Sequence, residues 1–230
     1  MQTSTTSATD RRIVDLSHRL DADIPMFPGL SAPESEELVS REASRSHYAG
    51  DTTFLIQRYH LVGNSGTYMD TPFHRYADGD DLASLPLAHT VDLAGVVFDA
   101  TALVSVGRLH VDADDLIDIP VEGRAVLMRT GWDAHWPGPD YLAANPHLTD
   151  AAARLLIERG AVLVGIDSWN VDDTNDGHRP VHSRLLRAGI PIVENLCRID
   201  QLPTSGFRFY AAPLAIVGGS AIPVRAFAIV

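Results

Sequence analysis

The hydrophobic and polar positions along the chain predict short β-prone runs that alternate with helical segments. Apolar runs of the length typical of strands in a buried sheet occur at 90–101, 125–130 and 161–168. The segment 149–160 has Ala and Leu at helical spacing, Thr149 as a possible N-cap and a glycine as a possible end. We therefore expect a helix there, followed directly by a buried strand.

A second helix followed by a strand is predicted over 181–190 and 191–196. Two such units in succession imply some parallel strand pairing. A shorter helix is expected over 111–119. The segment 207–230 contains β-prone runs separated by Gly-Gly and Pro, which is typical of antiparallel strands closing a mixed sheet.

The amino-terminal part of the chain is less regular. An early strand is expected over 12–20, a polar surface excursion over 31–50, and a strand over 52–63, rich in aromatic and β-branched residues. Residues 1–10 are polar and Thr/Ser-rich, so we expect a disordered tail there and a single domain over 11–230.

Composition excludes several classes of function. A chain of 230 residues with 45% hydrophobic content can bury a core, and a net charge of -12 disfavours nucleic acid as a partner. Cys197 is the single cysteine, which rules out an intrachain disulfide and favours a cytoplasmic location. Apolar runs are too short to cross a bilayer, so no membrane partner is expected.

The stretch NSGTYMDTPFH at 64–74 carries candidate chemistry, because Asp70 and His74 lie four residues apart in a segment broken by Pro72. Either this is a loop that solvates itself, or the two side chains face a common centre. Polar residues at strand ends beside apolar strands are the candidates for such a centre, and His182, at the start of a predicted helix, is a third.

Glu194 lies inside the apolar run 191–196, where an uncompensated carboxylate would be costly to bury. It needs a cation, a proton or several hydrogen-bond donors, and a divalent metal or an imidazolium would serve. The alternative is an exposed edge or an ion pair with an arginine such as Arg225.

These residues belong to a wider pattern. Over nearly its whole length the chain resembles the cyclase or kynurenine-formamidase-like family of metal-dependent hydrolases, which includes isatin hydrolases. The matching blocks are DLSHRLDADIPMFPG at 15–29, RTGW at 129–132, NPHLTDAAARLL at 145–156, GIDSWNVD at 165–172 and HSRLLRAGIPIVENL at 182–196. The resemblance implies an α/β, swivelling β/β/α fold with a mixed sheet, and homodimers or homotetramers in which aromatic residues of one subunit can complete the neighbour's pocket.

The family signature is His-x-Gly-Thr-His-x-Asp-x-Pro-x-His, which supplies metal ligands and a catalytic histidine, with a later His and Glu added. In this chain the signature falls on Asn64, Gly66, Thr67, Tyr68, Asp70, Pro72 and His74. Asp70, His74, His182 and Glu194 match the pattern. The resemblance thus implies that Asp70, His182 and Glu194 bind metal and that His74 is catalytic.

Asn64 and Tyr68 replace two metal-binding histidines of the signature. An Asn carbonyl is a weak ligand, and a Tyr phenol must lose a proton with a pKa of about 10 to bind well. We therefore expect one divalent metal, Zn or Mn, in place of a two-metal centre.

Three functions are compatible with these residues. In the first, water activated by the metal and by His74 hydrolyses a carbon-nitrogen bond in a small amide, formamide or lactam, with Tyr68 donating to the oxyanion and Asn64 orienting the carbonyl. In the second, no metal binds, and His74 is the acid/base catalyst of a cyclase, dehydratase or lyase acting on a small carbonyl compound. In the third, the protein is an inactive sensor of a small molecule. The resemblance favours hydrolysis.

Candidate substrate contacts are aromatic and cationic. Phe27, Trp132 and Trp169 could line an aromatic pocket, although core packing is the commoner use of such residues. Arg75 and Arg179 could bind a substrate carboxylate or belong to a surface network of ion pairs. The expected partner is a small, ring-bearing molecule.

Overall fold

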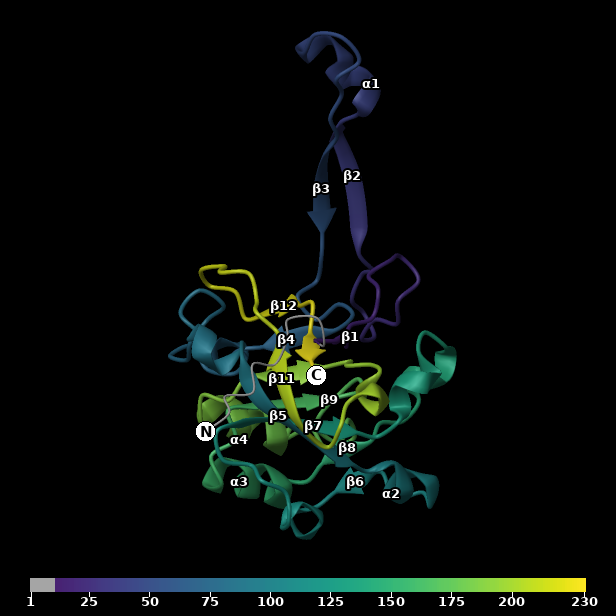
Figure 1. Cartoon of the computed structure of the whole chain (residues 1–230). Helices are drawn as coiled ribbons and strands as arrows, with labels where there is room; N and C mark the ends of the chain where they lie inside the picture. The colour runs from purple at the N-terminus through teal and green to yellow at the C-terminus, as the bar shows by residue number, and fades with distance from the viewer. Residues whose placement is uncertain (1–10) are drawn as a thin grey trace.

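The computed structural model describes residues 11–230, so the tail expected at 1–10 lies outside the described residues. Nine strands form a mixed sheet (Figure 1). In spatial order they are β1 (Ile13–Asp15), β13 (Phe227–Ile229), β11 (Ser205–Tyr210), β5 (Leu93–Asp99), β7 (Arg124–Arg129), β9 (Leu163–Ile166), β10 (Ile192–Glu194), β4 (Tyr68–Asp70) and β12 (Ala221–Pro223). The chain therefore has the expected α/β fold with a mixed sheet.

The centre of the sheet is parallel and its two sides are antiparallel. Strands β5, β7, β9 and β10 pair in parallel, as the two helix-strand units predicted. Strands β11 and β13 pair antiparallel, as expected for the end of the chain. The predicted strand over 12–20 is confirmed in part, since β1 contains only three residues.

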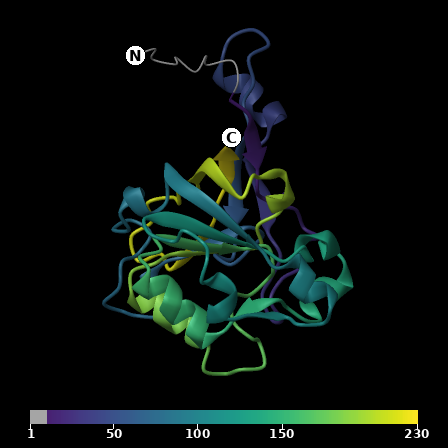
Figure 2. The same cartoon turned by 60° about the horizontal axis from the view of Figure 1, so that its bottom comes forward.

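Side chains of the central strands alternate between two apolar cores. On β7, Val126 and Met128 belong to one core, and Ala125 and Leu127 to the other. The first core lies under α3 (Asp150–Glu158) and α4 (Pro180–Arg187), which pack against each other on one side of the sheet (Figure 2). Thr149 caps α3 as predicted, because its hydroxyl accepts the N–H of Ala152 at 3.1 Å.

Short elements connect these layers. Strands β6 (His110–Val111) and β8 (His147–Leu148) form a small parallel pair, and α2 (Thr101–Ser105) precedes them. The short helix expected over 111–119 is confirmed only in part, since a single 3-10 helix, η4 (Ala113–Leu116), forms there. The other 3-10 turns are η2 (Pro72–His74), η3 (Leu87–His89), η5 (Trp132–His135), η6 (Pro139–Leu142) and η7 (Ile199–Gln201).

A β-hairpin arm, residues 34–60, projects from the body (Figure 1). It consists of β2 (Glu34–Val39) and β3 (Ile56–His60), with α1 (Arg41–Ser44) and η1 (Arg45–His47) at its tip. The strand expected over 52–63 is therefore β3, but it pairs only with β2 and does not enter the main sheet. The stretch 64–74 supplies a strand of the main sheet, β4, instead.

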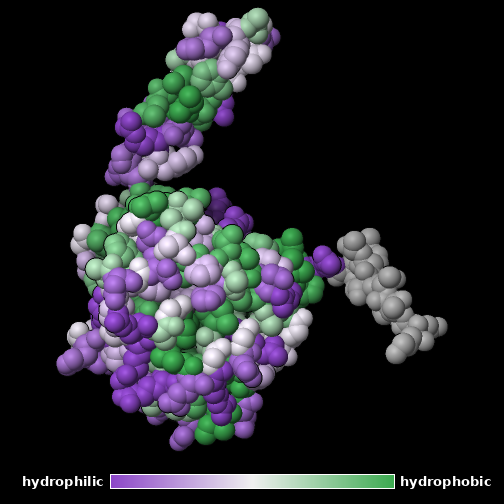
Figure 3. Space-filling view, turned by 90° about the vertical axis from the view of Figure 1, so that its left-hand side faces the viewer, coloured by the Kyte–Doolittle hydropathy of each residue, from purple (hydrophilic) through white to green (hydrophobic). Residues whose placement is uncertain are grey.

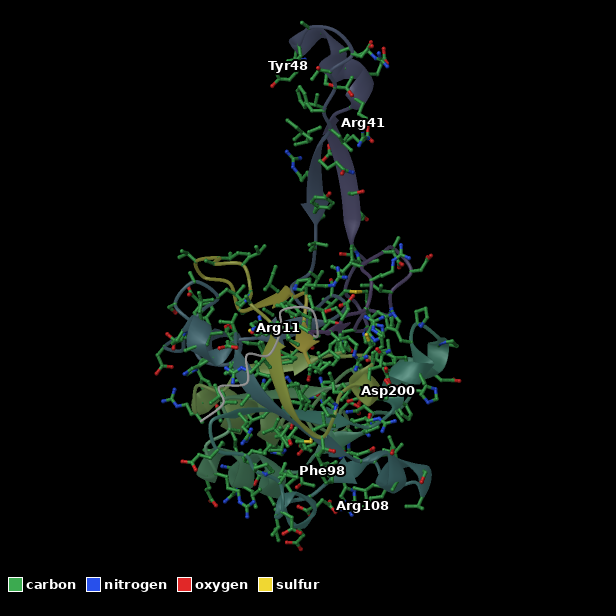
Figure 4. The ribbon with its side chains drawn as sticks, in the orientation of Figure 1. Arg11, Arg41, Tyr48, Phe98, Arg108 and Asp200 are labelled. Carbon is green, nitrogen blue, oxygen red and sulfur yellow. The ribbon has the colours of Figure 1, made fainter. Side chains whose placement is uncertain are left out.

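The arm exposes apolar side chains (Figure 3). Leu38, Tyr48, Ile56 and Tyr59 are each exposed to 46% or more. Tyr48 lies at the end of the arm farthest from the body (Figure 4). A two-stranded hairpin is marginally stable by itself, so this surface favours a packing partner. Among residues 11–230, no helix has the length and apolar character that a transmembrane span requires.

The packing of the sheet predicts the effect of substituting Gly95 on β5. A Cβ atom there would lie 1.9 Å from a ring carbon of the buried Phe207. We expect Gly95→Ala to lower the free energy of unfolding by about 1–3 kcal/mol through overpacking, measured by denaturant titration. Gly177→Ala is the control, because a Cβ there meets no atom within 4 Å; equal stability of the two variants would contradict this packing.

Candidate functional site

The pairing of β4 with β10 brings three polar side chains to one face of the sheet. Tyr68 lies directly opposite Glu194, and Asp70 lies opposite Ile192. Because side chains alternate along a strand, Tyr68, Asp70 and Glu194 share a face, whereas Met69 turns to the opposite core. Asp70 and Glu194 are fully buried.

His182 reaches the same place from the first turn of α4. The carboxylate of Asp172 accepts the backbone N–H groups of Val181 at 2.7 Å and His182 at 3.0 Å, and it also binds Nδ1 of His182 at 2.6 Å. Asp172 thus holds both the start of the helix and the imidazole ring. Nε2 of His182 lies 3.5 Å from Oδ2 of Asp70 and 3.5 Å from Oε1 of Glu194.

Neutral donors satisfy most of the buried carboxylate oxygens. Oδ1 of Asp70 accepts a hydrogen bond from the Asn64 amide at 3.2 Å. Oε1 of Glu194 accepts from the backbone N–H of Val171 at 2.6 Å, and Oε2 accepts from the Tyr68 hydroxyl. Among the described residues, Oδ2 of Asp70 has no hydrogen-bond partner. A buried polar atom left unpaired in this way requires an explanation.

The cluster fits a divalent cation. One ligand atom from each of Asp70, His182 and Glu194 lies within 4.8 Å of the others, and all three residues are buried. Two carboxylates and an imidazole are suitable ligands for zinc or manganese. A histidine that binds metal also needs a partner for its second ring nitrogen, and Asp172 provides it. The structure therefore brings together the predicted ligand set.

Charge explains the protonation of the cluster. Burial alone would lower the pKa of His182, but the charges of Glu194 and Asp70 and the hydrogen bond with Asp172 raise it to about 10. Burial and the charges of Glu194 and Asp70 raise the pKa of Tyr68 well above its usual value. These surroundings therefore favour the neutral phenol.

A cavity of about 260 Å³ opens over this cluster. It is lined by Pro25, Phe27, Leu30, Asn64, Tyr68, Asp70, His74, Arg75, Tyr141, Leu142, Trp169, Asn170, Arg179, His182 and Asn195. His74 belongs to this lining, and its Nδ1 lies 3.4 Å from Oδ1 of Asp70. The motif residues therefore face a common centre and do not form a self-solvating loop.

Three residues make contacts that differ from uses considered for them in the sequence. Trp132 is not among the described residues that line the cavity; its indole N–H donates to the carbonyl of Tyr141 at 2.9 Å, so it supports the wall from behind. Tyr68 has one hydroxyl proton, which it donates to Glu194, so it has none for an oxyanion in this arrangement. Arg225 pairs with Asp15 at 2.6 Å and does not neutralise Glu194.

Sequence reasoning missed several residues of the site. Asp172 lies between β9 and α4, and an acidic residue shortly before a predicted helix was a usable signal for it. Tyr141 donates to the Asn195 side chain at 2.7 Å, and Asn195 donates to the carbonyl of Gly66 at 2.6 Å. Asn195 has a left-handed backbone, φ 56°, which Asn tolerates. No pattern in the sequence marks Tyr141.

Comparisons with known proteins agree with this geometry. A family model described as "Putative cyclase" matches residues 14–173. The kynurenine formamidase of Bacillus mycoides (strain KBAB4) is 31% identical over 214 residues, covering 93% of this chain and 95% of the relative. Isatin hydrolase A from Labrenzia aggregata, solved with benzyl benzoate, is 27% identical with a TM-score of 0.83, covering 99% of this chain and 96% of that chain. Isatin hydrolase A from Ralstonia solanacearum is 25% identical with a TM-score of 0.81, covering 100% of both chains.

The contacts of Asp172 predict a change in metal affinity. Asp172→Asn removes the carboxylate charge that faces Nδ1 of His182. The affinity for Zn²⁺ is therefore expected to fall about 10–100-fold, measured by competition with a chelator of known affinity. Asp173→Asn is the matched control, since that side chain binds only Asn175 among the described residues. Equal affinities for both variants, with folding confirmed by circular dichroism, would contradict the role of Asp172.

Proposed function

Because this chain belongs to the cyclase family, we propose that it is a metal-dependent hydrolase of a carbon-nitrogen bond in a small amide, formamide or lactam. The names of the relatives, kynurenine formamidase and isatin hydrolase, support this reaction class. The observation that carries the proposal is the convergence of Oδ2 of Asp70 with His182 and Glu194 beneath a cavity.

Asp70, His182 and Glu194 would hold one divalent ion, Zn or Mn. When bound there, it would supply Lewis-acid activation of water and of the substrate carbonyl. Asp172 fixes the ring of His182 in the orientation that points Nε2 at the two carboxylates. The Tyr68 hydroxyl and the Val171 N–H similarly fix the carboxylate of Glu194.

His74 is the proposed acid/base catalyst. Its side chain is about one-third exposed, lines the cavity, and is oriented by Oδ1 of Asp70. It takes a proton from the attacking water as the new carbon-oxygen bond forms. It then gives that proton to the nitrogen as the carbon-nitrogen bond breaks, which yields an amine and a carboxylic acid that releases its remaining proton to solvent at neutral pH.

Asn64 is the proposed group that orients the substrate carbonyl. It lines the cavity, and one amide hydrogen binds Asp70. The second amide hydrogen remains to donate to a carbonyl oxygen. Tyr68, by contrast, acts as a positioning residue through Glu194.

The metal-free cyclase, dehydratase or lyase is less well supported. It leaves Oδ2 of Asp70 buried with no donor among the described residues. It also departs from the hydrolytic names of the relatives. Metal analysis of the purified protein, followed by assays on formylated anilines and lactams, distinguishes hydrolysis from the metal-free reaction and from a sensor without activity.

We also propose a homodimer or homotetramer in which the β-hairpin arm packs on a second copy of the chain. The arm exposes Leu38, Tyr48, Ile56 and Tyr59 and has no layer of the body covering it (Figure 1). Burying this surface would stabilise a hairpin that is marginal alone. Cys197, free and buried, supports the proposed cytoplasmic location.

The proposed roles of His74 and Asp70 can be separated. His74→Gln should lower kcat about 10²–10⁴-fold with one metal per chain retained, because it removes only proton transfer. Asp70→Asn should lower both turnover and metal content, because it removes a ligand. Mass spectrometry of the metal and steady-state kinetics measure the two effects. Full activity in a folded His74→Gln variant would remove the proposed catalyst.

The arm predicts a change in assembly. The double variant Leu38→Ser/Tyr59→Ser should shift the protein from oligomer to monomer, measured by light scattering after size-exclusion chromatography, because it removes exposed apolar surface from the arm. Glu37→Gln, also exposed on the arm, should leave the assembly unchanged. A wild-type protein that is monomeric at all concentrations would contradict this interface.

A further inference from the structure

Two guanidinium groups line the cavity of an otherwise acidic protein. The cavity lining contains Arg75 and Arg179, and its one carboxylate is Asp70. The whole chain, by contrast, has a net charge of -12. The two guanidinium groups therefore stand at the cavity, away from the buried carboxylates of the metal-ligand cluster in its floor, on a molecule that is negatively charged overall.

Neither arginine forms a salt bridge with a carboxylate among residues 11–230, although the charge of Arg179 contributes to a lowered pKa at Asp176. The Arg75 side chain is exposed and makes no hydrogen bond to a described residue, and Arg179 donates through Nη1 to the backbone carbonyl of Asp173 at 2.8 Å. Several arginines elsewhere on the surface are paired with carboxylates, for example Arg129 with Asp99, Arg187 with Asp78, and Arg208 with Asp92. The two cations that line the cavity thus keep their charge available to a ligand.

The backbone holds both arginines at the cavity. Arg75 directly follows η2 and Arg179 directly precedes α4, and these two elements pack against each other. Tyr76 links them, since its hydroxyl donates to the carbonyl of Ser183 at 2.7 Å. Arg179 has a left-handed backbone, φ 49°, which is unfavourable for a non-glycine residue and persists where the surrounding structure requires it.

Aromatic side chains supply another part of the lining. Phe27 and Trp169 lie with ring centroids 5.8 Å apart at an interplanar angle of 50°. A cavity of about 260 Å³ suits a ligand with one ring. The lining thus combines the metal-ligand cluster, an aromatic surface and two guanidiniums.

We propose that Arg75 and Arg179 form a carboxylate-binding subsite, so that the substrate is an aromatic amide or formamide with a carboxylate on or near its ring. Planar guanidinium groups match a planar carboxylate in two-point hydrogen bonds. The proposal rests on the proposed function, because it assigns a substrate class to the same cavity. Arg75 and Arg179 are specificity residues in this scheme and take no part in the bond cleavage.

The test compares substrates that differ only in charge. The 2-, 3- and 4-formamidobenzoates are assayed against the corresponding formamidobenzamides with the metal-loaded enzyme. Both series present the same formamide to the metal-ligand cluster, so the ratio of kcat/KM values isolates the charged substituent. We expect at least one benzoate to exceed its benzamide about 10–100-fold.

Variants of the two arginines locate the effect. Arg75→Gln and Arg179→Gln should each reduce this ratio about tenfold, and Arg179→Lys should restore only part of it, because the charge remains but the two-point hydrogen bonding is lost. Arg11→Gln is the matched control, since Arg11 is exposed and lies outside the cavity lining. The midpoint of unfolding of each variant shows whether it is folded. If a variant at Arg179, whose backbone is left-handed, is unstable, Arg75→Gln still tests the subsite.

The outcomes separate this proposal from the proposed function. A ratio near one for all three wild-type pairs, or a ratio unchanged in both Gln variants, overturns the subsite while hydrolysis stands. If no formamide is hydrolysed, the proposed function fails for this class, and calorimetric titration with the same compounds tests the subsite. Tighter binding of a benzoate than its benzamide, weakened by Arg75→Gln, supports the subsite in that case, and equal binding overturns it.

Discussion

The register between β4 and β10 is the constraint on which the site depends. It places Tyr68 opposite Glu194 and puts Asp70 on the same face. A shift of one residue would turn Asp70 into the apolar core and bring Met69 to the cavity. The alternation of apolar residues that specifies the core therefore also sets the direction of the Asp70 and Glu194 side chains. The fold and the site depend on the same strand pairing.

Burying several carboxylates together is the energetic problem that this arrangement has to solve. An ionised carboxylate without a partner is very costly in an apolar interior. The chain offsets that cost with donors from separate elements, namely the Val171 N–H, the Tyr68 hydroxyl and the Asn64 amide, and with the nearby His182 imidazole. None of these groups cancels all the negative charge, and a cation at the proposed metal site would complete the compensation.

Local sequence patterns contained much of the fold and the reactive set. Helix α3 was predictable from its cap and spacing, and the parallel strands followed from the order of elements. Glu194 was predictable as a site residue because a carboxylate in an apolar strand needs a cation, a proton or hydrogen-bond donors. The arm, the membership of β4 in the main sheet and the place of Trp132 were not predictable, because each depends on contacts between segments far apart in the chain.

Asp172 has a consequence for how the protein acquires its site. The same carboxylate closes the first turn of α4 and holds the ring of His182. Helix initiation and ligand orientation are therefore one cooperative event, and the connection between β9 and α4 cannot be remodelled for one purpose alone. A substitution that alters the start of α4 would also alter the orientation of the His182 ring, which restricts the paths by which this part of the protein can evolve.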